Sequence, residues 1–350
     1  MREKAITKGK FRMEAISEYR SEIYGISIFW IMLFHLNESH YYTPWENNKI
    51  FHYILDVIKI GNMGVDIFLF LSGICLYFSF TKNPDVLNFL RKRLSRILYP
   101  LFLTSGIWWI WYLLSGKISI WGLTNRLSLV QFWISKDSQV WFASLIMALY
   151  LLYPYIYFFL FEKKDDKSIL LRTIGLLAFS IIVTVGVYME APEVYENLSR
   201  ALPRLAVFVT GCYAGKYVYE KKHIGVWIPI VSWLLFLVAL AASWKMGLRD
   251  SIVFRYVYWI GGVALAFFLA VFFCYMPRWF NKIWSCLGAV SLELYFTHVV
   301  LRRVLKETPL CNFVEDRYLF KILFVLIGAF IWAEITAKLV TWLKTKRKVN

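Results

Sequence analysis

The chain has 350 residues, of which 59% are hydrophobic and 19% aromatic, and its mean hydropathy is +0.54. A water-soluble domain is nearer half apolar, so this composition excludes a soluble enzyme with an ordinary polar surface. The net charge of +17 does not indicate a nucleic-acid partner, because Lys and Arg lie mostly in short segments between apolar runs, where they orient membrane spans and meet anionic headgroups.

Apolar segments of the roughly 20 residues needed to cross a bilayer recur along the whole chain. We predict spans at about 21–37, 63–80, 97–115, 140–161, 169–189, 201–219, 224–245, 252–276, 283–301 and 319–343. The sequence therefore predicts an all-α polytopic protein of the inner or plasma membrane, a bundle of about ten transmembrane helices. A single domain would cover 1–350, with short basic tails at about 1–18 and 344–350.

Charge in the flanking segments predicts the orientation of these spans. With a cytoplasmic N-terminus, the cytoplasmic flanks hold more Lys and Arg than the outer flanks, and an even number of spans agrees with this arrangement. We therefore expect both termini to be cytoplasmic. Two outer segments, 51–60 and 118–134, are too short or too polar to span. They are either helices that lie in the outer interface or re-enter the bundle, which could roof an outward-facing cavity, or plain surface loops.

Ionisable side chains within spans are costly in lipid and indicate function by default. They are His35, Asp66, Arg204, Lys216, Arg255, Glu293, His298, Glu334 and Lys338. His35 is the most informative, since it ends the otherwise apolar run IYGISIFWIMLFH on the outer side of the first span. It is either a catalytic imidazole or a group that bonds a neighbouring helix. Arg20 precedes it by four helical turns, about 22 Å along the axis.

Three other side chains of the outer half are candidate neighbours of His35. Asp66 opens the second span, where it either caps the helix or orients the imidazole, and Glu38 is a second candidate for that orienting role. His298 lies near the outer end of the ninth span, with Glu293 deeper in the membrane. His35, Asp66, Trp141 and His298 could form one cluster.

A basic segment, FLRKRLSRILYP (89–100), precedes the third span on its inner side. Arg91, Lys92, Arg93 and Arg96 in this segment satisfy the positive-inside rule, and they would equally suit a phosphate-bearing cytosolic ligand. The five cysteines show no metal-binding spacing, so no metal is expected.

Six segments in this order resemble the acyltransferase-3 family of integral membrane acyltransferases, over about residues 18–340. They are YRSEIYGISIFWIMLFH, GVDIFLFLSGICLYF, FLRKRLSRILYP, VWFASLIMALYLLYP, LPRLAVFVTGCYAGK and SLELYFTH. His35 resembles the family's essential histidine and Arg20 its basic partner. Arg20 departs from the commoner spacing, whose position is occupied here by Tyr24.

The resemblance implies further matches, residue by residue. They are Asp66, Ser72 and Gly73; Arg91, Arg93 and Arg96; Trp141, Phe142 and Ser144; and Tyr295 and His298. It implies transfer of an acetyl or other short acyl group from cytosolic acetyl-CoA to a hydroxyl of an extracytoplasmic glycan or glycolipid. Arg91, Arg93 and Arg96 would hold the CoA phosphates, and His35 would act as general base or as an acyl carrier.

The oxyanion of the tetrahedral intermediate needs a hydrogen-bond donor. Trp141, Tyr295 and Arg204 are the candidates, and Glu293 is a further candidate substrate contact. A secondary transporter or exporter of a lipid-linked or small anionic or sugar substrate is the alternative function, because it would share the span count and the buried charges.

Overall fold

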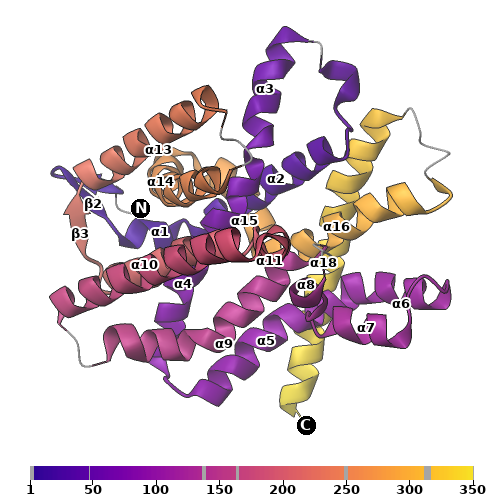
Figure 1. Ribbon diagram of the computed structural model, residues 1–350, viewed down its shortest axis with the longest axis horizontal. Helices are drawn as coiled ribbons and strands as arrows, with labels where there is room; N and C mark the ends of the chain where they lie inside the picture. The colour runs from indigo at the N-terminus through magenta and orange to yellow at the C-terminus, as the bar shows by residue number, and fades with distance from the viewer. Residues whose placement is uncertain are drawn as a thin grey trace.

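Helices make up nearly all of the part of the chain that the computed structural model describes, which is residues 4–46, 48–135, 139–162, 165–247, 251–310 and 317–349. They pack side by side as a bundle, with the C-terminus at the bottom of the view in Figure 1. The predicted all-α membrane fold is confirmed.

The helices have the following bounds. In the first half they are α1 Glu14–Glu18, α2 Arg20–Glu38, η1 Thr43–Trp45, α3 Lys49–Lys59, η2 Gly61–Met63, α4 Gly64–Lys82, α5 Val86–Leu101, the π-helical η3 Phe102–Gly106, α6 Ile107–Leu114, α7 Ile120–Leu127, α8 Gln131–Ile134 and α9 Trp141–Phe161. In the second half they are α10 Asp166–Glu190, α11 Pro192–Leu198, η4 Leu202–Arg204, α12 Leu205–Tyr219, α13 Trp227–Lys245, α14 Ile252–Tyr275, α15 Arg278–Ala289, α16 Ser291–Glu307 and α18 Tyr318–Val349.

Within the described residues, 7 helical stretches are long and apolar enough to cross a membrane. They are Lys49–Lys82, Val86–Leu114, Trp141–Phe161, Asp166–Glu190, Trp227–Lys245, Ile252–Tyr275 and Tyr318–Lys346. If α15 and α16, which meet at a bend of 67°, form one further span, the number of candidate spans is 8. The predicted count of ten is therefore too high by this measure. The predicted spans 21–37 and 201–219 do form helices, but α2 carries polar groups at both ends and α12 has only 15 residues.

The two segments expected at the outer surface are helical. The segment 51–60 lies in α3, whose first turn is capped by the Asn48 side chain. The helix α3 is not a separate surface element, because it continues through the short turn η2 into α4, and the three form one helical stretch, Lys49–Lys82. The segment 118–134 contains α7 and α8.

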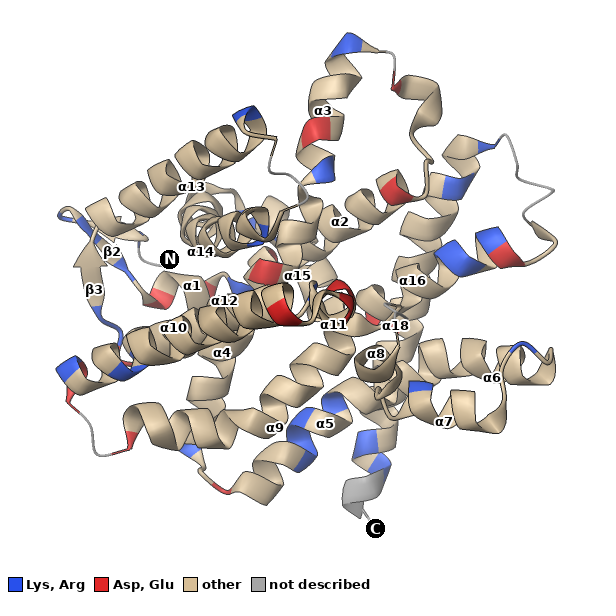
Figure 2. Cartoon of the chain, viewed as in Figure 1, with Lys and Arg blue, Asp and Glu red and all other residues tan. Residues whose placement is uncertain are grey.

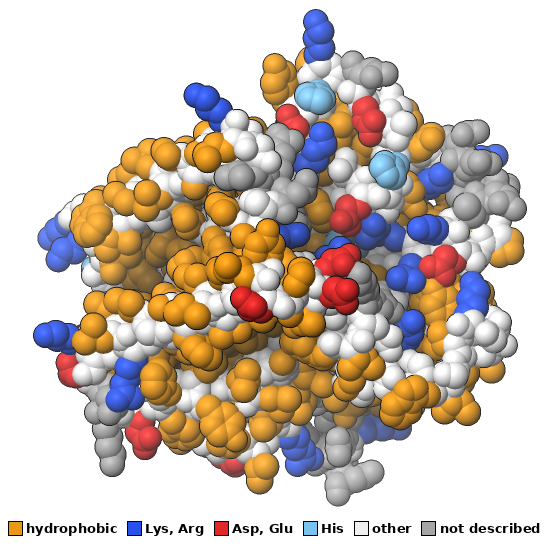
Figure 3. Space-filling view, viewed as in Figure 1, with side chains coloured by type: hydrophobic (Ala, Val, Ile, Leu, Met, Phe, Trp, Pro, Cys, Tyr) orange, Lys and Arg blue, Asp and Glu red, His pale blue; other side chains and the backbone are white. Residues whose placement is uncertain are grey.

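The helices divide into a central one and peripheral ones. In the apolar stretch that includes α4, the rest of the protein buries 83% of an apolar segment of 18 residues. The corresponding buried share is 22% for α10, 11% for α13 and 22% for α18. The peripheral helices expose Leu, Ile, Val and Phe, as lipid requires, and the orange surface in Figure 3 covers most of that view. The helix α4 therefore lies at the centre of the bundle, and the peripheral helices face lipid.

A contact between two glycines brings α2 against α15. A Cβ atom on Gly25 would lie 1.9 Å from the Trp284 carbonyl oxygen, and one on Gly288 would lie 1.8 Å from the Ser21 carbonyl oxygen. Small residues allow such close backbone approach, which is how membrane helices associate without a hydrophobic driving force. Since α16 follows α15 directly, this contact also fixes α16 relative to α2.

The N-terminal segment is folded against the bundle. Strands β1 (Ile6–Thr7) and β2 (Lys10–Arg12) form a hairpin, and β2 also pairs antiparallel with β3 (His223–Gly225), between α12 and α13. Phe11 is fully buried, and Arg12 donates to Glu18 Oε2 at 2.9 Å. This small sheet was not predicted, because its strands are two or three residues long and come from distant parts of the chain.

Candidate active site

Two cavities lie along the bundle, one toward each end of α2. The first, which we call the histidine cavity, has a volume of about 820 Å³ and is lined by the C-terminal part of α2, the start of α9 and the C-terminal half of α16. The second, the arginine cavity, has a volume of about 470 Å³ and is lined by the N-terminal half of α2, by α4 and by α5. Both are of a size that holds a small-molecule ligand.

His35 and His298 meet in the wall of the histidine cavity. His35 Nδ1 lies 2.8 Å from His298 Nε2, and the rings are nearly parallel. His298 is fully buried, whereas 17% of the His35 side chain is exposed. The expected neighbourhood of these two histidines is therefore present, with His298 as the direct partner of His35.

The contacts of His298 define the tautomers of both rings. Its Nδ1 lies 2.7 Å from the Leu294 carbonyl oxygen, which can only accept, so the proton must be on Nδ1. A neutral His298 then offers Nε2 as an acceptor, and His35 Nδ1–H donates to it. This leaves the lone pair of His35 on Nε2, which is the arrangement that a general base requires.

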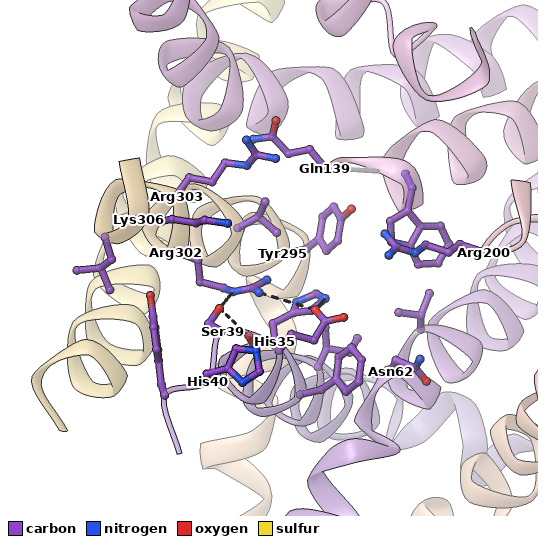
Figure 4. A pocket seen from close by; sticks show the side chains of 18 of the residues that line it. His35, Ser39, His40, Asn62, Gln139, Arg200, Tyr295, Arg302, Arg303 and Lys306 are labelled. Carbon is purple, nitrogen blue, oxygen red and sulfur yellow. Dashed lines mark hydrogen bonds and ion pairs between the residues drawn. The ribbon is translucent and has the colours of Figure 1, made fainter. Parts of the chain in front are cut away.

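Glu38 and Arg302 lie beside the free nitrogen of His35. Glu38 Oε2 is 3.7 Å from His35 Nε2 and 3.7 Å from Arg302 Nη2. Arg302 Nε donates to Ser39 Oγ at 2.9 Å, and Ser39 Oγ donates to the His35 carbonyl oxygen at 3.0 Å (Figure 4). Arg302 thus ties the end of α2 to α16 around the imidazole.

Asp66 pairs with Arg204, and no contact joins it to His35 among the described residues. Both Arg204 Nε and Nη2 lie 3.3 Å from Asp66 Oδ2, and both side chains are almost completely buried. The Arg204 guanidinium also lies 4.9 Å from the ring centre of Trp141. The cluster expected from the sequence therefore consists of two groups, a histidine pair and an Asp66–Arg204–Trp141 group, with His35, Trp141 and Arg204 all lining the histidine cavity.

Cations dominate the walls of the histidine cavity. The basic residues that line it are Arg200, Arg204, Arg255, Arg302, Arg303, Lys306 and Lys321, against the acidic residues Glu38 and Glu307. In Figure 4, Arg200 lies across the cavity from Arg302 and Lys306, and Tyr295 lies between the two sides. Sequence reasoning missed Arg200, Arg302, Arg303 and Lys306. For Arg302, Arg303 and Lys306 the signal was a group of Lys and Arg in 302–321, a flank predicted to be outside, where the positive-inside rule expects few.

The arginine cavity has a basic mouth and a largely apolar interior. Arg20, Lys82, Arg93 and Arg96 line it, and Arg93 Nη2 donates to the Cys75 carbonyl oxygen at 3.4 Å. Arg91 lies on the exposed face of α5 and lines neither cavity.

Arg20 and Glu293 also do not lie where their predicted roles would place them. Arg20 is separated from His35 along α2, lines the other cavity, and lies 3.4 Å from Cys75 Sγ through its Nη1. Glu293 lines neither cavity. Throughout the described ranges, no three His, Cys, Asp or Glu side chains gather in a way that could hold a metal ion.

The two cavities share part of their walls. Ile31, Val65 and Tyr295 line both of them, and Ile31 lies one helical turn before His35. Figure 2 shows the Lys and Arg residues of α5 and of α16 as two separate groups on the chain. A ligand bound at the basic mouth of the arginine cavity would therefore point its far end toward Tyr295 and His35.

Comparison with known proteins identifies the family of this chain. An acyltransferase domain profile matches residues 25–340. The chain is also 30% identical over 124 residues to acyltransferase MdmB of Streptomyces mycarofaciens, and this alignment covers 30% of each protein. No solved structure matches. Because the profile covers most of the chain, the protein belongs to the acyltransferase-3 family, and with its candidate spans it is a multi-pass membrane protein.

Proposed function

We propose that the protein transfers an acetyl or other short acyl group from cytosolic acyl-CoA to a hydroxyl of an extracytoplasmic sugar or surface polysaccharide. The observation that carries this proposal is the shared wall of the two cavities, with a basic mouth on one side and a histidine with a free nitrogen on the other. With the predicted orientation, the arginine cavity opens to the cytosol and the histidine cavity to the outside.

In this proposal, the arginine cavity binds the donor. Arg93 and Arg96, with Arg20 and Lys82, hold the phosphates of CoA, because guanidinium groups donate in pairs to phosphate oxygens. The uncharged pantetheine arm then lies along the apolar interior, past Phe68 and Phe142, and brings the thioester to Tyr295. An acyl group is small and uncharged, so its passage avoids moving a charged carrier through the membrane.

In the proposed reaction, His35 Nε2 removes the proton of the acceptor hydroxyl, and the oxygen attacks the thioester carbonyl carbon. The tetrahedral intermediate collapses with cleavage of the carbon–sulfur bond. The CoA thiolate then takes the proton from the His35 imidazolium, so that the base is restored. His298 holds the imidazole with Nε2 facing the cavity. Attack by Nε2 itself, through an acyl-imidazole, would use the same geometry.

Tyr295 is the best placed of the three oxyanion donors considered from the sequence. Its hydroxyl is buried without a hydrogen-bond partner among the described residues, in the wall common to both cavities. Arg204 is already paired with Asp66 and lies against Trp141. A donor left unpaired in the resting protein is available to the charge that develops during the reaction.

The donor site is tested by replacing Arg93 and Arg96 singly with Ala. We expect the KM for acetyl-CoA to rise about 10- to 100-fold in each variant, because a hydrogen bond to a charged group contributes about 1.5–3 kcal/mol. The measurement is release of CoA thiol by purified protein supplied with acceptor. Lys92→Ala is the matched control, since Lys92 lies on the same helix and lines neither cavity. An unchanged KM in both arginine variants would contradict this donor site.

The role of His298 in positioning His35 is tested with His298→Gln and His298→Asn. The Gln side chain can place an acceptor near the position of Nε2, whereas the shorter Asn reaches only the position of Nδ1. We expect His298→Asn to lower kcat about tenfold, as loss of one hydrogen bond implies, and His298→Gln to keep more of the activity. The KM for acetyl-CoA should not change in either. Equal kcat losses in the two variants would indicate a packing role only.

A further inference from the structure

Some cations of the histidine cavity form no ion pair with an acidic side chain of the described residues. Arg302 is close to Glu38, Arg303 pairs with Glu307, and Arg204 pairs with Asp66. Arg200, Arg255 and Lys306 form no ion pair within the described part of the chain, although all three line the cavity.

These charges are not needed by the donor. In the proposed function, the phosphates of CoA bind at Arg93 and Arg96, which line the other cavity, and only the thioester reaches the histidine side. Arg200 and Lys306 are exposed and Arg255 is half-buried, so water screens their charges in part. Like charges that line one cavity still repel one another, and a bound anion relieves that repulsion. The anion must therefore enter from the side of the acceptor.

We propose that the acceptor is an anionic glycan, whose phosphate or carboxylate group is attracted by Arg200, Arg255 and Lys306 and binds to the cations of one side of the cavity, while a nearby hydroxyl meets His35 Nε2. Arg200 and Lys306 lie on opposite sides of the cavity that contains His35 (Figure 4). This inference rests on the proposed function and adds the class of acceptor. The cavity volume of about 820 Å³ is large enough for a sugar that carries such a group.

Binding is measured separately from turnover, so that failure of this inference differs from failure of the proposed function. The probes are glucose 1-phosphate, glucuronate and neutral glucose, added to His35→Ala protein in uncharged detergent without acetyl-CoA. We expect both acidic sugars to bind at least tenfold more tightly than glucose, with an affinity that falls as salt rises. Equal affinities for the three sugars would overturn the inference, whatever the result of turnover assays.

The assignment to this cavity is tested with Arg200→Gln and Lys306→Gln, two exposed residues whose replacement is not expected to disturb folding. At least one of the two should weaken binding of glucose 1-phosphate about tenfold, and both should leave binding of glucose unaffected. Arg278→Gln removes the same charge from an exposed residue at the start of α15, outside both cavities, and should change nothing. Unchanged binding in both test variants would place the anion elsewhere and overturn the assignment.

Two further probes distinguish the source of the anion. Inorganic phosphate should bind more weakly than glucose 1-phosphate, because it lacks the sugar. Phosphatidylglycerol added to the micelles should compete only weakly. If inorganic phosphate or the lipid bound as tightly as glucose 1-phosphate, the site would be one for a free anion or a lipid headgroup, and the glycan assignment would be wrong.

Discussion

His35→Ala is expected to lower the rate of acyl transfer by about 10²–10⁴-fold, the contribution that general acid–base catalysis usually makes. In the proposed reaction the imidazole removes the proton of the acceptor through Nε2, because its Nδ1 is already used by His298. The side chain is partly exposed to the cavity, so its removal should leave the protein folded and inserted. The measurement is release of CoA thiol from acetyl-CoA with acceptor present, together with the mass of the acylated product.

His52→Ala is the matched control for this experiment. His52 lies on α3, 60% of its side chain is exposed, and it lines neither cavity. We expect its replacement to leave the rate unchanged. Full acyl transfer by the His35→Ala protein would remove the general-base proposal and the acyl-carrier proposal together.

Asp66→Asn is expected to destabilise the protein strongly, by about 3–5 kcal/mol, the usual result of removing one partner of a buried ion pair. Arg204 would remain charged and almost completely buried, beside the Trp141 ring and the Arg200 carbonyl oxygen but without the carboxylate that compensates its charge. The apparent melting temperature in detergent measures the loss. Asp66→Leu combined with Arg204→Met should recover most of it, because this pair leaves no uncompensated charge.

Asp56→Asn on α3 is the control for that substitution. Asp56 also forms an ion pair, at 3.5 Å to Lys59, but both side chains are partly exposed, and exposed pairs contribute little. A melting temperature lowered as much by Asp56→Asn as by Asp66→Asn would show that burial of the pair does not determine its effect.

The helices could be predicted from the sequence because each apolar run is long enough to require one in lipid. The positions at which these helices bend or break could not be predicted from the sequence. The predicted span 283–301 is two helices with a bend of 67° after Ala289, and the helix that contains Pro100 continues as a π-helical segment at Phe102–Gly106. Such breaks depend on which neighbours satisfy the freed backbone groups, and a single run of residues does not reveal those neighbours.

The site was predictable in part. His35 was identifiable because a histidine is rare in an apolar run, but its partner was not, since the relative rotation of α2 and α16 depends on the contact between Gly25 and Gly288. For the same reason the sequence could not show that Asp66 pairs with Arg204. The basic segment of α5 was recognised, but the helix turns Arg93 and Arg96 toward the cavity and Arg91 away from it.

Transfer across a sealed membrane tests the central claim most directly, namely that His35 receives the acyl group from one side and the acceptor from the other. Inside-out vesicles from cells that make the protein are supplied with labelled acetyl-CoA, which does not cross the membrane. We predict His35-dependent accumulation of labelled glycan in the vesicle lumen. Label that appears only when acetyl-CoA and acceptor share one compartment would contradict the account.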